Sequence, residues 1–222
     1  MGLSLAYNLF YEAPPQDVFD AFAMFYERSG FVLLQSEDQT IGVERTSYDE
    51  DDSLEIFEPN GGWTVMTLDR GWAFERETRR DAQLFVSSKL LCSGFFIRVY
   101  DGDYWAYELF DKGNFLDNFV QEVETSEGRP PGTDAGSPEA IVSVFPWLEV
   151  HDVTPYLVQE NWDDPEERRR LDVPARPGDE FSRFDECSVL DFLRLLGLNV
   201  NMVNNRVTLA TSVRRQFWIR PV

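Results

Sequence analysis

The sequence predicts an α+β fold in which antiparallel sheets, built from hairpins and meanders, pack against two or three main helices. Three observations predict this fold. Apolar residues recur at helical spacing in long segments, and short β-rich runs are separated by turns that contain Gly and Asp. In addition, 43% of the 222 residues are apolar, which suffices for one sizeable core or for two small ones.

The first predicted elements are a helix and a hairpin. Residues 16–29 carry apolar side chains at helical spacing, and Ser29-Gly30 is typical of a helix end. Residues 31–34 then form an apolar run. We expect this strand to pair with residues 40–46.

An acidic loop and a strand pair are predicted next. Residues 48–53 contain no apolar side chain after Tyr48, as in a solvated loop. Residues 54–57 and 63–68 are rich in β-branched and aromatic residues and flank the Pro59-Asn-Gly-Gly62 turn. The sequence therefore predicts that these two strands are neighbours.

A second long helix over residues 74–92 precedes a three-stranded meander. Its apolar face ends at Ser93-Gly94. Asp101-Gly102 and Asp111-Lys-Gly113 are turn sequences between β-rich runs, and Asp-Gly is a strong hairpin signal. The meander strands are expected at residues 95–100, 103–110 and 114–119.

The chain contains one sign of internal repetition. Ser29-Gly30-Phe31 and Ser93-Gly94-Phe95 both close a predicted helix and open a predicted strand. One explanation is a duplication of a helix-plus-meander unit. The other is that Gly after a helix and Phe in the next strand is a common local solution.

Residues 124–138 are rich in Gly and Pro and poor in apolar residues, which predicts a linker or long loop. This divides the chain into an α+β part (residues 1–123) and a second part (residues 139–222) packed on the first. In the second part, capping side chains followed by Pro predict three short helices that start at residues 137, 154 and 164. A main helix (184–196), a hairpin (198–203 and 206–210) and a strand (216–220) complete it.

The charge indicates the kind of partner. Forty acidic and 20 basic residues give a formal charge of −20, which opposes contact with nucleic acid or anionic lipid. No signal peptide or membrane span is apparent. We therefore expect a cytoplasmic protein that neither binds nucleic acid directly nor contacts a membrane. Its expected partner is another protein of basic character. Association with further copies of the same chain is the alternative considered.

Motifs for catalysis and cofactor binding are missing from the sequence. His151 is the single histidine, which excludes two-histidine zinc sites, and no GxSxG, GxGxxG or P-loop motif occurs. Cys92 and Cys187 are too far apart for a CxxC pair and are expected to be small buried residues. We expect no cofactor, no metal and no catalytic residue.

Acidic tracts leave one alternative open. Carboxylates bind Ca²⁺ or Mg²⁺ through oxygen ligands, but neither acidic tract matches an EF-hand. The first tract consists of Asp49, Glu50, Asp51 and Asp52 and is interpreted as a solvated loop or as a site for a metal or partner. The second, Asp101-Gly-Asp103, is explained by hairpin geometry.

An aromatic strand is a second candidate surface. Trp105 and Tyr107 would share one face of a strand, and Tyr104 would lie on the other with Phe110. The strand is thus apolar on both sides. Its second face either belongs to a second layer of core or forms an exposed aromatic patch for a protein interface.

Several motifs carry a resemblance. Ser87-Ser-Lys-Leu90, Arg98-Val-Tyr-Asp-Gly-Asp-Tyr-Trp105, Thr154-Pro-Tyr-Leu-Val158 and Asp191-Phe-Leu-Arg-Leu-Leu-Gly197 resemble segments of bacterial proteins of unknown function. The resemblance covers about half of the chain and implies a fold but no activity. Small acidic α+β proteins also occur among the immunity proteins of bacterial toxin systems, which is an analogy of fold alone.

The acidity is not uniform along the chain. Residues 1–191 carry all the acidic residues and a formal charge of −25, whereas residues 192–222 carry five arginines. Arg214, Arg215 and Trp218 are therefore candidate contact residues. They pair with acidic strands of the same chain in one account, and in the other they contact an anionic group or a second copy.

Three functional hypotheses follow. The first is a non-catalytic acidic module that binds a protein in bacteria, either neutralising a toxin or regulating a basic partner. The second is a nucleic-acid mimic, or anti-defence protein, that occupies a DNA-binding enzyme. The third is a metal-dependent enzyme that uses carboxylates.

Overall fold

The computed structural model describes residues 5–35, 52–68, 76–100, 104–121, 134–159, 165–183, 185–203, 206–209 and 214–221. Its elements, in chain order, are β1 (Leu5–Tyr11), α1 (Pro15–Arg28), β2 (Phe31–Gln35), β3 (Asp52–Phe57), β4 (Trp63–Leu68), α2 (Arg76–Leu90), β5 (Ser93–Tyr100), β6 (Tyr104–Asp111), β7 (Asn114–Val120), α3 (Pro138–Val144), α4 (Val150–Val153), the 3₁₀ helix η1 (Thr154–Tyr156), α5 (Pro165–Leu171), α6 (Ser188–Leu195), β8 (Val200–Val203), β9 (Arg206–Leu209) and β10 (Arg214–Pro221).

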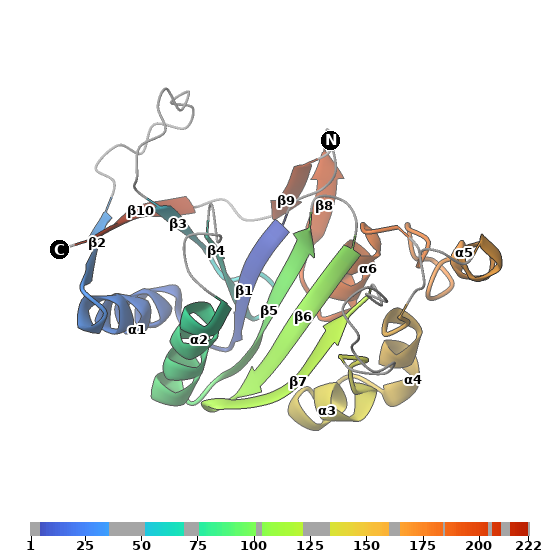
Figure 1. Cartoon of the computed structure of the whole chain (residues 1–222), viewed down its shortest axis with the longest axis horizontal. Helices are drawn as coiled ribbons and strands as arrows, with labels where there is room; N and C mark the ends of the chain where they lie inside the picture. Colours follow the sequence, from blue (N-terminus) through green and yellow to red (C-terminus); the bar gives the residue numbers. More distant parts are fainter. Residues whose placement is uncertain are drawn as a thin grey trace.

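The architecture is a mixed α+β fold around one antiparallel sheet, as the sequence predicts. Eight strands pair in the order β2-β10-β3-β4-β1-β5-β6-β7, and β8-β9 form a separate hairpin. Helices α1 and α2 lie on one face of the sheet, and α3, α4 and α6 lie on the other (Figure 1). The sheet is therefore the middle of three layers.

The larger core fills the face covered by α3, α4 and α6. Strands β1, β4, β5 and β6 contribute alternate side chains, as the two-residue period of a strand requires. Phe192 of α6 lies against Trp105 and Tyr107, with ring centroids 5.2 and 6.1 Å away. Phe145, after α3, stacks on Phe95 at 5.4 Å. Aromatic packing thus attaches this helical layer to the sheet.

The smaller core fills the face covered by α1 and α2. Val18 and Phe22 of α1 and Val86 of α2 are buried there against Phe10 and Phe110 of the sheet. Strands β1 and β6 consequently have apolar side chains on both faces. This confirms a second layer of core over the aromatic strand and leaves Trp105 and Tyr107, each 1% exposed, inside the protein.

Two turns are joined across the larger core. Asn60, in the turn between β3 and β4, donates from Nδ2 to the carbonyl of Asn199 and accepts from its N–H, both at 2.9 Å. The indole N–H of Trp63 donates to the carbonyl of Leu196 at 2.8 Å. The segment after α6 is thereby fixed to the strand pair that the sequence predicted at residues 54–68.

The C-terminal strand was predicted, but its position was not. β10 lies between β2 and β3, with Trp218 opposite Leu34 on one side and Ser53 on the other. The expected partner of β2, residues 40–46, lies outside the described residues. Because β2 pairs with β10 while β5 pairs with β1 and β6, the two helix-and-strand units considered as a duplication have different neighbours.

The helices follow their local signals with small differences. Ser137 caps α3 and accepts the N–H of Ala140 at 3.1 Å, as predicted from its Ser-Pro start. The main helix after residue 184 begins later than predicted, at Ser188. Asp185 accepts the N–H of Cys187 at 2.7 Å and holds a turn there.

The larger core draws on both parts of the predicted domain division. Most of the expected linker, residues 122–133, lies outside the described residues. The division itself stays a prediction.

Gly61 gives a test of the contact between the two turns. Its φ is +62°, and a Cβ atom would lie 1.9 Å from the carbonyl oxygen of Gly197. We expect Gly61→Ala to lower the free energy of unfolding by about 3 kcal/mol. Gly30→Ala is the matched control, since φ is +85° with open space around it, and should cost about 1 kcal/mol. Equal losses in chemical denaturation would show that the contact is not tight.

Candidate functional site

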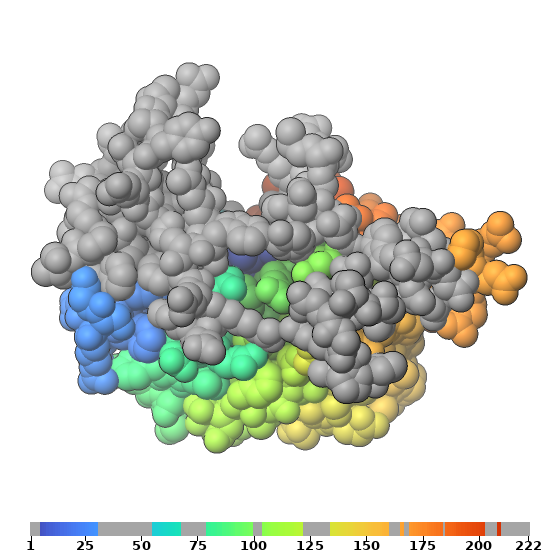
Figure 2. All heavy atoms as spheres, in the orientation of Figure 1, coloured from blue at the N-terminus to red at the C-terminus, as the bar shows by residue number. Residues whose placement is uncertain are grey.

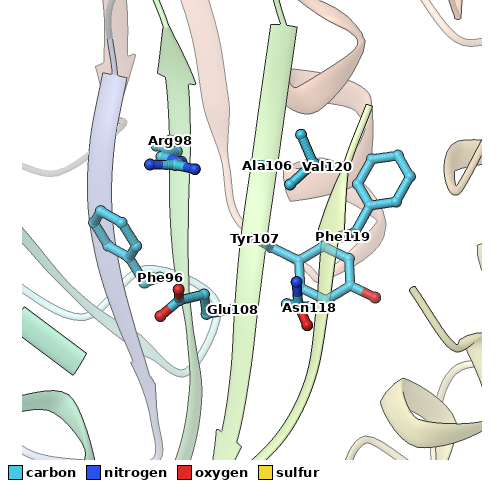
Figure 3. A pocket seen from close by; sticks show the side chains of 8 residues that line it. All are labelled: Phe96, Arg98, Ala106, Tyr107, Glu108, Asn118, Phe119 and Val120. Carbon is cyan, nitrogen blue, oxygen red and sulfur yellow. The ribbon is translucent and has the colours of Figure 1, made fainter. Parts of the chain in front are cut away.

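A polar hollow lies over strands β5, β6 and β7. Arg98, Glu108 and Asn118 project into it from these three neighbouring strands, beside Phe96 (Figure 3). Its empty volume is about 210 Å³, open solvent included. Pockets that enclose drug-sized ligands are larger, roughly 300–1,000 Å³, so the hollow is a shallow surface feature.

Two of the polar groups of the hollow, Glu108 and Asn118, are engaged with other side chains of the protein. Glu108 accepts two hydrogen bonds from Arg80 of α2, at 2.6 and 3.2 Å. This carboxylate raises the pKa of Arg80, and the guanidinium also lies 4.3 Å from the ring centroid of Phe115. Asn118 donates to the carboxylate of Asp134. The bidentate ion pair between Arg80 and Glu108 fixes α2 to the sheet.

A buried polar contact supports the same attachment. Asn8 of β1 is 1% exposed and accepts from Nε2 of Gln83 at 2.6 Å. It also donates to the carbonyl of Met66. Because a buried amide needs partners, Gln83 sets the position of α2 over the sheet.

An exposed aromatic corner lies at the C-terminal end of β1, next to Tyr11. Trp147, in the turn between α3 and α4, is 46% exposed. Its ring lies 4.6 Å from that of Tyr11 and 5.3 Å from that of Phe145. Tyr11 in turn contacts Trp63 at 5.1 Å. We call Tyr11, Trp147 and Val150, which is 39% exposed, the Trp147 corner.

Two acidic residues are close in sequence to the aromatic residues of the Trp147 corner. Glu12 follows Tyr11 in a left-handed conformation, with φ at 52°, and its N–H donates to the carbonyl of Gly62 at 2.9 Å. Burial, the charge of Glu12 and a hydrogen bond to Glu12 raise the pKa of Tyr11. Glu149, two residues after Trp147, is also exposed. An exposed indole face can attract a cationic side chain.

Among the residues that the structure describes, one group of adjacent side chains has donor atoms close enough to hold a metal. Asp185, Glu186 and Cys187 offer two carboxylates and a thiol within 4.8 Å of one another. Burial and a hydrogen bond to Asp185 raise the pKa of Cys187, so the thiol is held in its protonated form. Since metals bind the thiolate, the donors left for a metal are the two carboxylates, and that of Asp185 already accepts the N–H of Cys187.

The structure disperses the residues singled out in the sequence. Asp49, Glu50 and Asp51 lie outside the described residues, and Asp52 begins β3. Tyr104 is half-buried in β6. Arg214, Arg215 and Trp218 belong to β10, where the first two pair with Phe57 and Ile56 of β3. The C-terminal strand thus pairs with the acidic body through its backbone. His151 is exposed, and its Nδ1 lies 3.2 Å from the carboxylate of Glu149.

Trp147 was missed as a candidate. The segment Trp147-Leu-Glu-Val150 reads as an apolar run, yet only Leu148 of it is buried. Pro146, directly before Trp147, could have indicated that the tryptophan is exposed. A proline turns the chain and so interrupts the helical spacing of the apolar residues.

Comparison with known proteins gives no match. No family model, no curated protein and no solved structure matches the chain. Within the described ranges, none of the helices has the length and apolar character needed to cross a membrane. The resemblance to bacterial proteins of unknown function therefore stays an expectation.

The two thiols give a test of burial. Cys92 is 7% exposed, and burial together with the charge of Asp111 raises its pKa to about 11. We expect native protein to react with Ellman's reagent at pH 8 at least about 100-fold more slowly than unfolded protein. The rate should rise up to about pH 11, and single Cys→Ser variants assign each thiol. Fast labelling of folded protein at pH 8 would contradict the burial of the assigned thiol.

Proposed function

We propose that the protein acts by binding a basic protein partner, with no chemistry of its own. Neutralisation of a toxin or regulation of an enzyme in the bacterial cytoplasm is the concrete form of this proposal. The observation that carries it is the Trp147 corner, where an exposed indole is braced by the half-buried ring of Tyr11 and the buried ring of Phe145.

Bracing supports a binding role for Trp147. Its contacts with Tyr11 and Phe145 hold the ring in one orientation before any partner arrives. Binding then loses little side-chain entropy. Tryptophan is also among the residues most enriched at the energetic centres of protein interfaces.

Charge supports a basic partner. The formal charge of −20 attracts a cationic protein over long distances and accelerates encounter. Glu12 and Glu149, which are exposed and close in sequence to the rings of the corner, then offer short-range partners for lysine or arginine, and an indole face also attracts cations. The nucleic-acid mimic and the metal-dependent enzyme stay predictions, and no particular contact in the described residues favours them.

Replacement of Trp147 tests the proposal. We expect a Trp147→Ala bait to lose the partner that wild-type protein captures from host lysate, with Kd for the purified partner at least about 30-fold weaker, or about 2 kcal/mol. Trp147→Phe should retain part of the affinity. Raising the salt from 50 to 200 mM should slow association.

Val173→Ala is the matched control, because Val173 is 43% exposed and is not one of the residues of the Trp147 corner. It should bind as wild type does. Equal capture by Trp147→Ala and wild-type baits, with both proteins folded by circular dichroism, would overturn the proposal.

A further inference from the structure

A second exposed apolar surface lies where α2 ends beside the turn between β6 and β7. Leu91, Phe115 and Leu116 are 71%, 38% and 43% exposed. The N–H of Lys112 donates to the carbonyl of Cys92 at 3.0 Å, which ties the two segments together. We call Lys89, Leu91, Lys112, Phe115 and Leu116 the α2–β7 surface. It reaches the lower rim of the molecule in the views of Figures 1 and 2.

Within the part of the chain that the structure describes, the first half of β7 is an open sheet edge. β7 is the last strand in the sheet order. Its second half is covered, because Phe119 bridges to Ala135 and the N–H of Val120 donates to the carbonyl of Asp134 at 2.9 Å. Among the described residues, none pairs with the outer side of residues 114–116. Backbone N–H and C=O groups on the unpaired side of a strand can form hydrogen bonds with another strand.

Leu91 holds a backbone conformation that leucine disfavours. It follows α2 with φ at 52°, and the N–H of Cys92 donates to the carbonyl of Ser87 at 3.1 Å. This is the position where helices favour glycine. The left-handed backbone conformation destabilises a leucine by about 1–2 kcal/mol. Because the side chain of Leu91 is exposed, its packing offsets little of this free energy.

Lys112 shows the same conflict. Its φ is 46° and that of Gly113 is +85°, so the hairpin turn has two left-handed residues. Asparagine followed by glycine is favoured in such a turn. Two adjoining exposed positions therefore carry residues that the fold does not favour, which is typical of surfaces kept for binding.

The charge of this surface differs from that of the rest of the chain. Lys89 and Lys112 are the only two lysines in a sequence of 40 acidic residues, and both are exposed here. The neighbouring carboxylate of Asp111 lies 3.5 Å from Lys112 and also accepts a hydrogen bond from Ser93. The surface therefore favours an anionic partner, the opposite of the Trp147 corner.

We propose that the α2–β7 surface binds an extended, acidic and apolar peptide segment of another protein. The segment pairs with the open edge at residues 114–116 and places apolar side chains on Leu91, Phe115 and Leu116. Its carboxylates lie beside Lys89 and Lys112. The site is separate from the Trp147 corner and is independent of the function proposed there.

A second copy of the chain is the other occupant considered. Two copies that met through this surface would bring lysines toward lysines. This like-charge contact opposes association of two copies, whereas carboxylates of an acidic chain would be attracted to the same lysines. We therefore assign the edge to a different, acidic chain and use the oligomeric state as one arm of the test.

The probe is a set of ten-residue peptides of alternating Val and Glu in differing registers, measured by calorimetry with the full chain. The same peptides with Lys in place of Glu, and with alternate backbone N-methyl groups, are the peptide controls. We expect the best Glu peptide to bind at least about 10-fold more tightly than either control. Failure of every Glu peptide to bind, or equal binding of the Lys or N-methyl forms, would overturn the proposal.

Two substitutions separate binding from folding. Leu91→Gly and Lys112→Asn each relieve a left-handed residue, so both should preserve or raise Tm. Each should nevertheless weaken the best Glu peptide by at least about 10-fold, while Trp147→Ala and Val173→Ala should not.

Unchanged affinity in both Leu91→Gly and Lys112→Asn would exclude a role for this surface. A concentration-dependent dimer in sedimentation that Leu116→Asp dissociates would show instead that a second copy covers it. Since Trp147→Ala tests only the other corner, failure of one proposal leaves the other intact.

Discussion

Burial of the central strands on both faces is the constraint on which the rest of the structure depends. β1 and β6 have a core above and a core below, so they need apolar side chains in consecutive positions and not only in alternate ones. The few polar groups that remain there must find partners inside the protein. Asn8 is held by Gln83, and Glu108 is held by Arg80, so the two polar contacts also decide where α2 lies.

Local secondary structure could be predicted from the sequence because it depends on neighbouring residues. β4 matches its predicted range, residues 63–68, since β-branched residues follow a glycine turn. α3 begins at its predicted Ser-Pro cap. The meander of β5, β6 and β7 lies in sequence order because its turns are short. In each case, the determining interaction spans only a few residues.

Long-range placement was not readable in the same way. Nothing in the composition of β10 says that it pairs with β2 and β3. Likewise, Trp147 and Trp105 are both aromatic residues in apolar segments, but one is 46% exposed and the other 1%. Exposure depends on which helix covers which strand, and therefore on the whole tertiary arrangement. The candidate surfaces consequently emerged from the packing and not from motifs.

The position of β10 also governs how this protein is made. Almost the whole chain separates β2 from the strand that completes its hydrogen bonds, and β3 needs the same strand on its outer side. Contacts between such distant residues close slowly. On a ribosome, β2 and β3 must wait with bare edges until the last strand emerges, a period in which exposed strands are prone to aggregate. Chaperones that bind exposed strands would protect the chain during that interval.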